Sequence, residues 1–392
     1  MSEDNPSPPW QRWQRQALIA GVGGLVLWLI GALIWHDSAF QSYWFAWVFW
    51  SGLALGCLEL ACLQFLTRGA WSFAVQRPLE AGMATLPLML LFLVPAFFAM
   101  SQIFPWAATP LPMDEPHKRL YLTTPFFVVR ALLCFGALLP FGYRMRYWSL
   151  REDQKLMQPE PADRLRGLGA GGLVVYSICM LIASTDWVMS LEHKWFSTMF
   201  VVIFGIGQLL TALAACIAFI ILIPASVGYK DLFDKKRLRD LGNLLMAFVI
   251  FWTYITYGQF IIIWSGNLPP EIGWFLHRSS PGWITVLVVL LTLQFAFPFA
   301  MLLSRATKAH PMRLAMVALL VFGMNVLNHF WLVVPSFPGS HWRVLLLSIP
   351  VFVGMGGLWV FVFIKAFLGR AALPRLVVEQ IQAAKEKEVA HG

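Results

Sequence analysis

Charged residues are scarce in this sequence. Asp, Glu, Lys and Arg together make up 12% of the 392 residues, whereas hydrophobic residues make up 59%. The mean hydropathy is +0.68. This composition excludes an ordinary soluble domain and predicts a membrane protein. Function must therefore be sought in the few polar groups that lie within apolar segments.

Several chemical motifs are also missing. None of the five cysteines belongs to a CxxC pair, so no iron–sulfur or zinc site of the usual spacing is predicted. The sequence has no glycine-rich phosphate-binding loop and suggests no set of nucleophile, histidine and acid. A haem held by two histidines needs them on facing helices, and only His329 lies clearly within an apolar stretch. We therefore expect the chain to hold no metal ion or haem of its own.

Ten apolar stretches fill most of the chain, and each is long enough to cross a lipid bilayer. A spanning helix needs about 20 apolar residues. Hydrocarbon cannot satisfy free backbone polar groups, so each stretch must be a helix. Pro87 and Pro95 predict kinks in the third helix. The stretches run at about residues 17–35, 43–66, 82–103, 124–142, 168–190, 196–223, 241–265, 282–303, 313–334 and 343–368.

We therefore expect an all-α integral membrane protein with ten transmembrane helices. Its membrane domain covers residues 17–368, between a polar N-terminal tail (1–16) and a C-terminal tail (369–392). Helices 2 and 6 enter the membrane from the same side. This topology is compatible with two parallel four-helix bundles, helices 2–5 and helices 6–9, with helices 1 and 10 as flanks.

The positive charge of the chain indicates its orientation. The net charge is +9, and alternate loops with both tails hold 23 of the 29 Lys and Arg residues, whereas the intervening loops hold 5. By the positive-inside rule, both termini lie in the cytoplasm. The basic surplus thus reports topology and contact with membrane lipids, and we expect no nucleic-acid partner.

Glu59 is an ionisable residue within the second predicted helix. Gly52 and Gly56 share its helical face, and small residues let another helix approach closely. Since an ionisable group in a membrane must face protein or water, this face is expected to point inward. A buried carboxyl group can hold and release a proton near neutral pH, which favours a proton relay. The alternative is a protonated, hydrogen-bonded packing residue.

Arg130 in the fourth helix and Asp186 near the outer end of the fifth lie at comparable depth. Arginine keeps its charge in proteins and needs a carboxylate or carbonyl groups nearby. The two residues are therefore candidates for a structural ion pair that fixes these helices. Asp186, Ser190 and His193 also share one helical stripe, which makes Asp186 and His193 candidates for a proton path.

The helices of the second bundle each carry polar residues near mid-membrane. Asn325, Asn328 and His329 share one face of the ninth helix, and histidine can pass protons near working pH. Four such helices are able to surround a hydrated path, although His329 is equally compatible with a satisfied interior group. The polar residues on the other three helices are Gln208, Thr211, Thr253, Thr256, Tyr257, Gln259 and Gln294.

A second candidate site lies at the outer boundary of the membrane. His36, His193, His277 and His341 all fall there in the predicted topology, and Trp195 lies near a helix end. His193, His277 and Trp195 are therefore candidates to line a pocket for a quinol head group. Histidine and tryptophan are also common as plain interfacial residues.

Two stretches resemble a known family. They are STDWVMSLEHKWFSTMF (184–200) and FWTYITYGQFIIIWSGNLPPEIGWFLHR (251–278). Both are similar to NrfD-like membrane subunits of bacterial alternative complex III, a quinol:electron-acceptor oxidoreductase, and most of all to the second, smaller of its two such subunits. The residues that belong to the matching strings are Asp186, Glu192, His193, Gln259, Asn267 and Glu271.

This resemblance implies the two-bundle fold and a place in the bacterial inner membrane. It also implies three kinds of partner: a second NrfD-like subunit, a periplasmic iron–sulfur subunit and multihaem cytochrome c subunits. Iron–sulfur clusters and haem c are then expected on the partners. Quinol is a possible ligand of this chain.

We therefore expect an integral subunit of a quinol-oxidising respiratory complex. The chain has groups that can carry protons but no predicted electron carrier, so electrons must leave through partners. Its preferred role is a scaffold with a proton route from Glu59 to Asp186, His193 and His329. The alternatives are an active quinol-binding anchor of another NrfD-type oxidoreductase, a proton-coupled secondary transporter, and a purely structural anchor.

Overall fold

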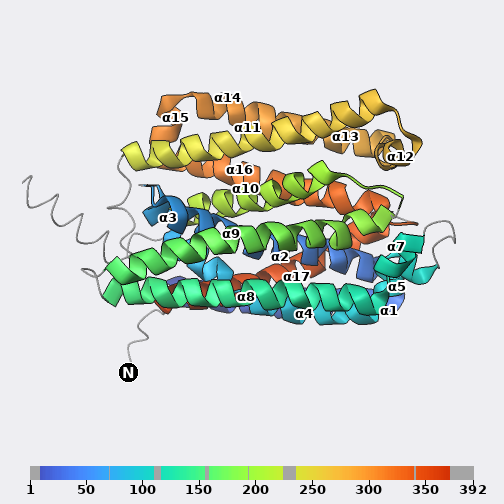
Figure 1. Cartoon of the computed structure of the whole chain (residues 1–392), viewed down its shortest axis with the longest axis horizontal. Helices are drawn as coiled ribbons and strands as arrows, with labels where there is room; N and C mark the ends of the chain where they lie inside the picture. The colour runs from blue at the N-terminus through green and yellow to red at the C-terminus, as the bar shows by residue number, and fades with distance from the viewer. Residues whose placement is uncertain are drawn as a thin grey trace, which may run out of the picture.

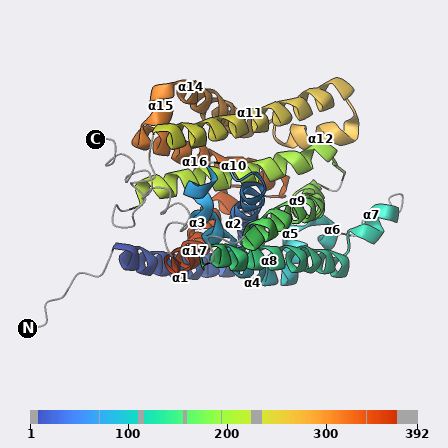
Figure 2. The ribbon, with the colours of Figure 1, turned by 60° about the vertical axis from the view of Figure 1, so that its left-hand side comes forward.

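The computed structural model describes residues 9–69, 71–109, 116–154, 159–192, 194–223, 235–339 and 341–370. These residues form helices and connecting turns, with no β-strand among them. Ten of the helical segments are long and apolar enough to cross a membrane, which confirms the predicted fold class. Figures 1 and 2 show them as a bundle of long, roughly aligned helices.

The helical elements are numbered in chain order. They are α1 (Pro9–Ile34), α2 (His36–Thr67), α3 (Ser72–Met83), α4 (Leu86–Phe98), α5 (Met100–Ile103), α6 (Pro105–Ala108), α7 (Pro116–Tyr121), α8 (Thr124–Gln154), α9 (Pro159–Trp187), η1 (Met189–Glu192), α10 (Thr198–Leu222), α11 (Lys235–Gly266), α12 (Pro269–His277), α13 (Pro281–Leu290), η4 (Leu291–Ala296), α14 (Phe297–Leu303), α15 (Arg305–Ala309), α16 (Pro311–Val333), η5 (Val334–Ser336) and α17 (His341–Leu368).

The spans pack as two four-helix bundles. In the first, α2 contacts α3, α4 and α9, and α8 packs against α9. In the second, α10 contacts α11 and α16, and the span built from α13, η4 and α14 packs against both α11 and α16. The two bundles meet along α2 and α10, the most deeply buried spans of the described chain. The expected grouping of helices 2–5 and 6–9 is therefore correct.

Helices α1 and α17 form the flank of the two bundles. They pack against each other, and α17 also contacts α2. Small residues make this contact possible, because a Cβ atom on Gly24 would lie 2.6 Å from the backbone oxygen of Pro350. A Cβ atom on Gly357 would lie 2.4 Å from the backbone nitrogen of Gly21. The close pairing explains why α1, although peripheral, is held along its length.

The third span is broken where the sequence predicts a kink. α3 ends at Met83 and α4 begins at Leu86, so the break directly precedes Pro87, which lacks the backbone N–H that a continuous helix needs. α3 differs from the prediction. The sequence predicts that the third helix begins at about residue 82, which leaves most of α3 in a predicted loop, whereas the structure has a helix from Ser72. Proline is tolerated again at Pro78 and Pro95, which lie inside α3 and α4.

The two ends of the bundle differ in what closes them. One end carries α7 and α12 and is called the α12 end; the other carries α15 and is called the α15 end (Figure 2). η1 and η5 lie at the α12 end, because Glu192 and Ser336 contact Arg278, which directly follows α12. α3 lies toward the α15 end (Figure 1). α1 begins and α17 ends at the α15 end. The spans therefore return the chain to the end where it starts, as ten crossings require.

Candidate functional site

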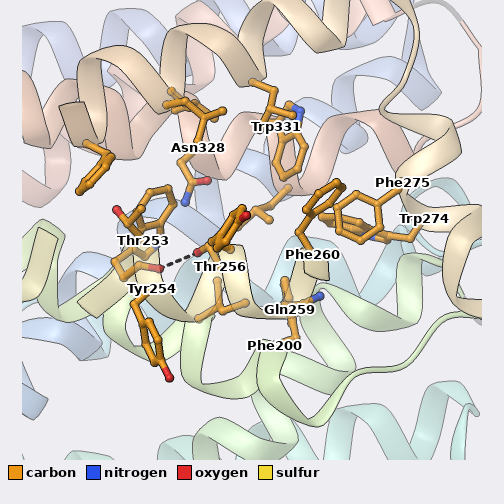
Figure 3. A pocket seen from close by; sticks show the side chains of 18 of the residues that line it. Phe200, Thr253, Tyr254, Thr256, Gln259, Phe260, Trp274, Phe275, Asn328 and Trp331 are labelled. Atoms are coloured by element: carbon orange, nitrogen blue, oxygen red, sulfur yellow. Dashed lines mark hydrogen bonds between the residues drawn. The ribbon is translucent and has the colours of Figure 1, made fainter. Parts of the chain in front are cut away.

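A large cavity lies within the second bundle, between α10, α11, α16 and the span of α13 and η4. Its volume is about 560 Å³. Nine of its nineteen lining residues are aromatic (Figure 3). The lining residues are Phe200, Ile203, Ile250, Trp252, Thr253, Tyr254, Thr256, Tyr257, Gln259, Phe260, Trp274, Phe275, Leu287, Leu290, Leu291, Phe295, Asn328, Trp331 and Leu332.

Two amide side chains contribute hydrogen-bonding groups to this cavity, beside the indole N–H groups of Trp252 and Trp331, which have no hydrogen-bond partner among the described residues. Gln259 and Asn328 are each only 4% exposed, and the Oε1 atom of Gln259 has no hydrogen-bond partner among the described residues. Figure 3 shows the Asn328 amide directed into the space between α16 and α11. The Thr253 and Thr256 hydroxyl groups donate to backbone oxygens one turn earlier, at 2.8 Å each, so they have only acceptor capacity left.

A second cavity of about 520 Å³ continues toward the α12 end. It shares the walls formed by Phe260, Phe275, Leu287 and Trp331 with the first cavity. Its far side is more polar, because Asn267, Arg278 and Ser279 contribute to it. The two cavities thus adjoin each other across these shared side chains, and the second has the more polar lining.

Glu59 lies in a buried polar cluster where α2, α9 and α10 meet. The hydroxyl group of Tyr176 lies beside its carboxyl group. The same hydroxyl donates to Gln208 Oε1 at 3.0 Å. Neither Glu59 Oε2 nor Gln208 Nε2 has a hydrogen-bond partner in the described structure. Glu59 therefore faces protein, as its glycine-rich helical face predicts.

The packing of α2 against α10 explains this inward orientation. A Cβ atom on Gly52 would touch the Gln208 side chain at 3.3 Å. On Gly56 it would lie 2.2 Å from the Gln208 backbone oxygen. The absence of side chains at these two positions brings the helices together and places the Glu59 carboxyl group at their interface.

His329 is buried between the two bundles, at 2% exposure. Its ring lies edge-on against Phe49 of α2, with the centroids 5.4 Å apart, and 6.1 Å from the ring of Phe204 in α10. Its Nδ1 atom is 2.8 Å from the Asn325 backbone oxygen. Because a carbonyl oxygen only accepts, Nδ1 carries the proton. The Nε2 atom of the neutral ring is then an acceptor, and it has no partner in the described structure.

A second buried amide lies behind His329. Gln294 donates through Nε2 to Asn325 Oδ1 at 3.3 Å, and its own Oε1 atom lacks a described partner. Gln294 belongs to η4, a single π-helical segment within the eighth span. Such π-helical insertions often occur at functional sites because they re-aim a side chain. The sequence identifies Gln294 but not this local distortion.

Arg130 and Asp186 form a buried, bidentate ion pair between α8 and α9. Arg130 Nε and Nη2 donate to the two Asp186 oxygens at 2.7 and 3.0 Å. Arg130 Nη1 donates to the Tyr121 backbone oxygen at 2.9 Å, and the guanidinium group stacks 3.7 Å from the Tyr121 ring centre. A carboxylate held this way by a permanent cation fixes two helices, and the geometry fits the predicted structural ion pair.

The candidate outer site is not gathered around one cavity. His193 lies outside the described residues. Trp195 is buried and stacks on Trp274 with ring centroids 4.8 Å apart. The His277 side chain is 61% exposed, and its Nδ1 atom lies 3.0 Å from Glu192. Neither Trp195 nor His277 lines the cavities described above.

The α12 end is instead organised around Arg278, which the sequence places in an outer loop. Arg278 is 2% exposed. Its five N–H groups meet acceptors at 2.8–3.2 Å: the Trp274, Trp331 and Leu332 backbone oxygens, Glu192 Oε1 and the Ser336 hydroxyl group. Burial lowers the pKa of Arg278 to about 10, and the Glu192 carboxylate opposes this shift. The side chain remains charged at neutral pH and ties α12 to η1 and η5.

The remaining predicted residues lie at different depths. Tyr257 is 62% exposed and forms part of the rim of the first cavity rather than its interior. Asn325 is fully buried on the face of α16 that also carries His329. The Asp186 carboxylate contacts Arg130 and Tyr121, and the Ser190 hydroxyl donates to the Asp186 backbone oxygen at 2.5 Å. The residues of the predicted path thus fall into the Glu59 cluster, the His329 cluster and the separate pair of Arg130 and Asp186.

A polar cluster at the α15 end was not predicted. Glu80 of α3, 1% exposed, accepts from Arg77 and Arg370 at 2.8 Å each and also from Ser149. Arg77 also pairs with Asp153 of α8. The only sequence signal was the spacing of Arg77 and Glu80, three residues apart. Their other partners come from α8 and the end of α17.

No group of three or more His, Cys, Asp or Glu residues that could hold a metal ion occurs in the part of the chain that the structure describes. The five cysteines are buried and free. No model of a protein family matches the chain, and no curated protein matches it. The functional argument therefore depends on the geometry of the two buried clusters and the cavity.

Proposed function

We propose that this chain is an integral membrane subunit of a quinol-oxidising respiratory complex of the alternative complex III type, with a proton-conducting role. The observation that carries the proposal is the pair formed by Glu59 and His329. Both are titratable, both lie between the bundles, and each has one buried polar atom without a described hydrogen-bond partner. Buried polar groups normally form hydrogen bonds, so we expect these atoms to bind water or to exchange a proton.

Glu59 connects through the Tyr176 hydroxyl group to Gln208. The His329 ring contacts Phe204, one turn before Gln208 in α10, and Phe49, ten residues before Glu59 in α2. These two aromatic rings form a layer against His329. A proton moving between the clusters would pass this aromatic layer on water molecules, because hydroxyl and amide groups conduct protons only with water between them. The layer would limit leakage when no water bridges it.

The second link of the proposal concerns the electrons. Oxidation of a quinol releases two protons and two electrons. The sequence offers no cysteine or histidine pattern typical of a redox centre, so the electrons would pass to iron–sulfur and haem c groups on partner subunits. In the proposed orientation, both termini and the α15 end face the cytoplasm of a bacterium, since most Lys and Arg residues lie there. The α12 end would then meet the periplasmic partners.

Proton release in vesicles tests the proposal. The intact complex carrying Glu59→Gln would be reconstituted, and protons released per quinol oxidised would be measured. We expect a lower ratio with the subunits still assembled, because glutamine keeps the size and polarity of the side chain but cannot exchange the proton. Asp37→Asn is the matched control, since the Asp37 side chain is 78% exposed. An unchanged ratio in Glu59→Gln would remove Glu59 from the mechanism.

A further inference from the structure

The cavity of the second bundle selects an uncharged ligand. No carboxylate, imidazole, ammonium or guanidinium side chain is among the described residues that line it. A charged ligand would lose its hydration there without gaining a counter-ion, which costs several kcal/mol. The polar groups that remain are neutral: the amides of Gln259 and Asn328, and the hydroxyl and indole groups of the lining Thr, Tyr and Trp residues.

The shape and chemistry of the wall favour a ring with oxygen atoms at its edges. Phe260, Trp274, Phe275 and Trp331 present aromatic faces or edges to the cavity (Figure 3), and these pack well against a flat ring. An amide side chain both donates and accepts hydrogen bonds. It therefore suits a carbonyl oxygen and a hydroxyl group equally. The volume of about 560 Å³ lies within the usual range for small-molecule sites.

The mouth of the cavity opens on the apolar outer surface of the second bundle. Tyr254 and Tyr257 of α11 are 71% and 62% exposed, and Leu291 of η4 is 49% exposed. All three line the cavity. Because this surface belongs to membrane-spanning segments, the ligand must enter from the lipid phase. A ring-bearing lipid with a long apolar tail meets this requirement, because its tail can remain among the lipid chains.

We propose that this cavity binds the head group of a membrane quinone, in both its oxidised and its reduced form, and holds it without taking its protons. The identification of this ring-bearing lipid as a quinone rests on the proposed function, and the rest of the inference does not. Gln259 and Asn328 recognise the ring oxygens. The lack of a base in the wall makes the cavity a holding site rather than an oxidation site, distinct from the titratable clusters at Glu59 and His329.

Quenching of tryptophan fluorescence measures this binding directly, because Trp252, Trp274 and Trp331 line the cavity. The full chain in lipid nanodiscs would be titrated with ubiquinone-1, a short-tailed quinone. We expect saturable quenching whose Kd rises about tenfold in Gln259→Leu and again in Asn328→Leu, since each loses one hydrogen bond to the ligand. Gln41→Leu is the matched control: it removes a buried amide in the first bundle and should leave Kd unchanged.

A third variant keeps the test decisive if either leucine variant fails to fold. Thr256→Phe adds volume at the cavity wall without removing a buried amide, and it should abolish the saturable phase. Quenching that stays linear with quinone concentration in the unchanged chain would overturn the proposal, because it would report only partition into lipid. Equal Kd values in all variants would overturn it as well.

The outcome is separable from that of the proposed function. Proton release in Glu59→Gln does not depend on the cavity, and quinone binding to the isolated chain does not depend on Glu59. The Kd measured at pH 6 and at pH 8 adds a further readout. A constant value is expected for a wall without a group that titrates in this range, and a strong pH dependence would contradict the holding site.

Discussion

Gly56 of α2 lies against the backbone of Gln208 in α10, so closely that a Cβ atom on it would be 2.2 Å from the Gln208 oxygen. This contact joins the two bundles and sets the position of Glu59 one turn away.

We predict that Gly56→Ala destabilises the protein by about 1–3 kcal/mol, since backbone rather than a flexible side chain would have to move. Thermal unfolding in detergent measures the effect. Gly258→Ala is the control: nothing lies within 4 Å of its Cβ position, and it should be neutral or stabilising.

The ion pair of Arg130 and Asp186 gives a second prediction. Arg130→Gln leaves the 1% exposed Asp186 carboxylate without its cation, which is expected to cost about 3–5 kcal/mol. The double variant Arg130→Met, Asp186→Leu should recover much of this loss, because neither charge remains. Unfolding midpoints of the two variants check this. If the single variant were as stable as the unchanged protein, the pair would not fix α8 to α9.

Part of this site is predictable from sequence, because ionisable groups inside apolar runs must be sheltered. That rule places Glu59, Arg130, Asp186 and His329 inside the protein. The structure buries Arg130, Asp186 and His329, and it buries one carboxyl oxygen of the half-buried Glu59. The glycine spacing before Glu59 also gives the correct helical face. These inferences need only residue type, depth and helical period.

Other features depend on information that local sequence does not contain. Arg278 follows a proline-rich loop, and its acceptors come from η1, α12, the end of α16 and η5, so its burial has no local signal. Glu80 is similar, since its partner Arg370 is 290 residues away in the sequence. The cavity requires the rotation of several helices about their axes, which hydropathy does not define.

The α12 end yields a third prediction, with a defined pH window. Glu192→Gln removes the carboxylate that opposes the lowering of the Arg278 pKa. The folded-state pKa of about 10 is below the ordinary pKa of arginine, so burial of the charged guanidinium group costs stability below pH 10. This cost fades as the pH rises above 10 toward the ordinary pKa of the side chain.

The variant should therefore be less stable than the unchanged protein throughout pH 6–9, where Arg278 stays charged. Unfolding midpoints across this range measure the loss. His277→Gln is the comparison, since the His277 side chain is 61% exposed and also contacts Glu192. A loss as large in His277→Gln would assign the stabilising role to the exposed contact rather than to Arg278.

A fourth prediction concerns His329. The ring already packs against Phe49 and Phe204, so His329→Phe should fold with little change in unfolding temperature. It removes the unpartnered Nε2 atom, and protons released per quinol should fall in vesicles containing the complex. His36→Phe serves as a control because the His36 side chain is 62% exposed. A normal ratio in His329→Phe would restrict the proton route to the Glu59 cluster.

The most direct test is an infrared difference spectrum of the complex, recorded between its oxidised and reduced states. The account predicts a carboxylic-acid carbonyl band that shifts in D₂O and disappears in Glu59→Gln, because Glu59 gains and loses its proton during turnover. The contrary result is a spectrum with no band that depends on Glu59. Glu59 would then be a permanently protonated packing residue, and the chain would serve as an anchor.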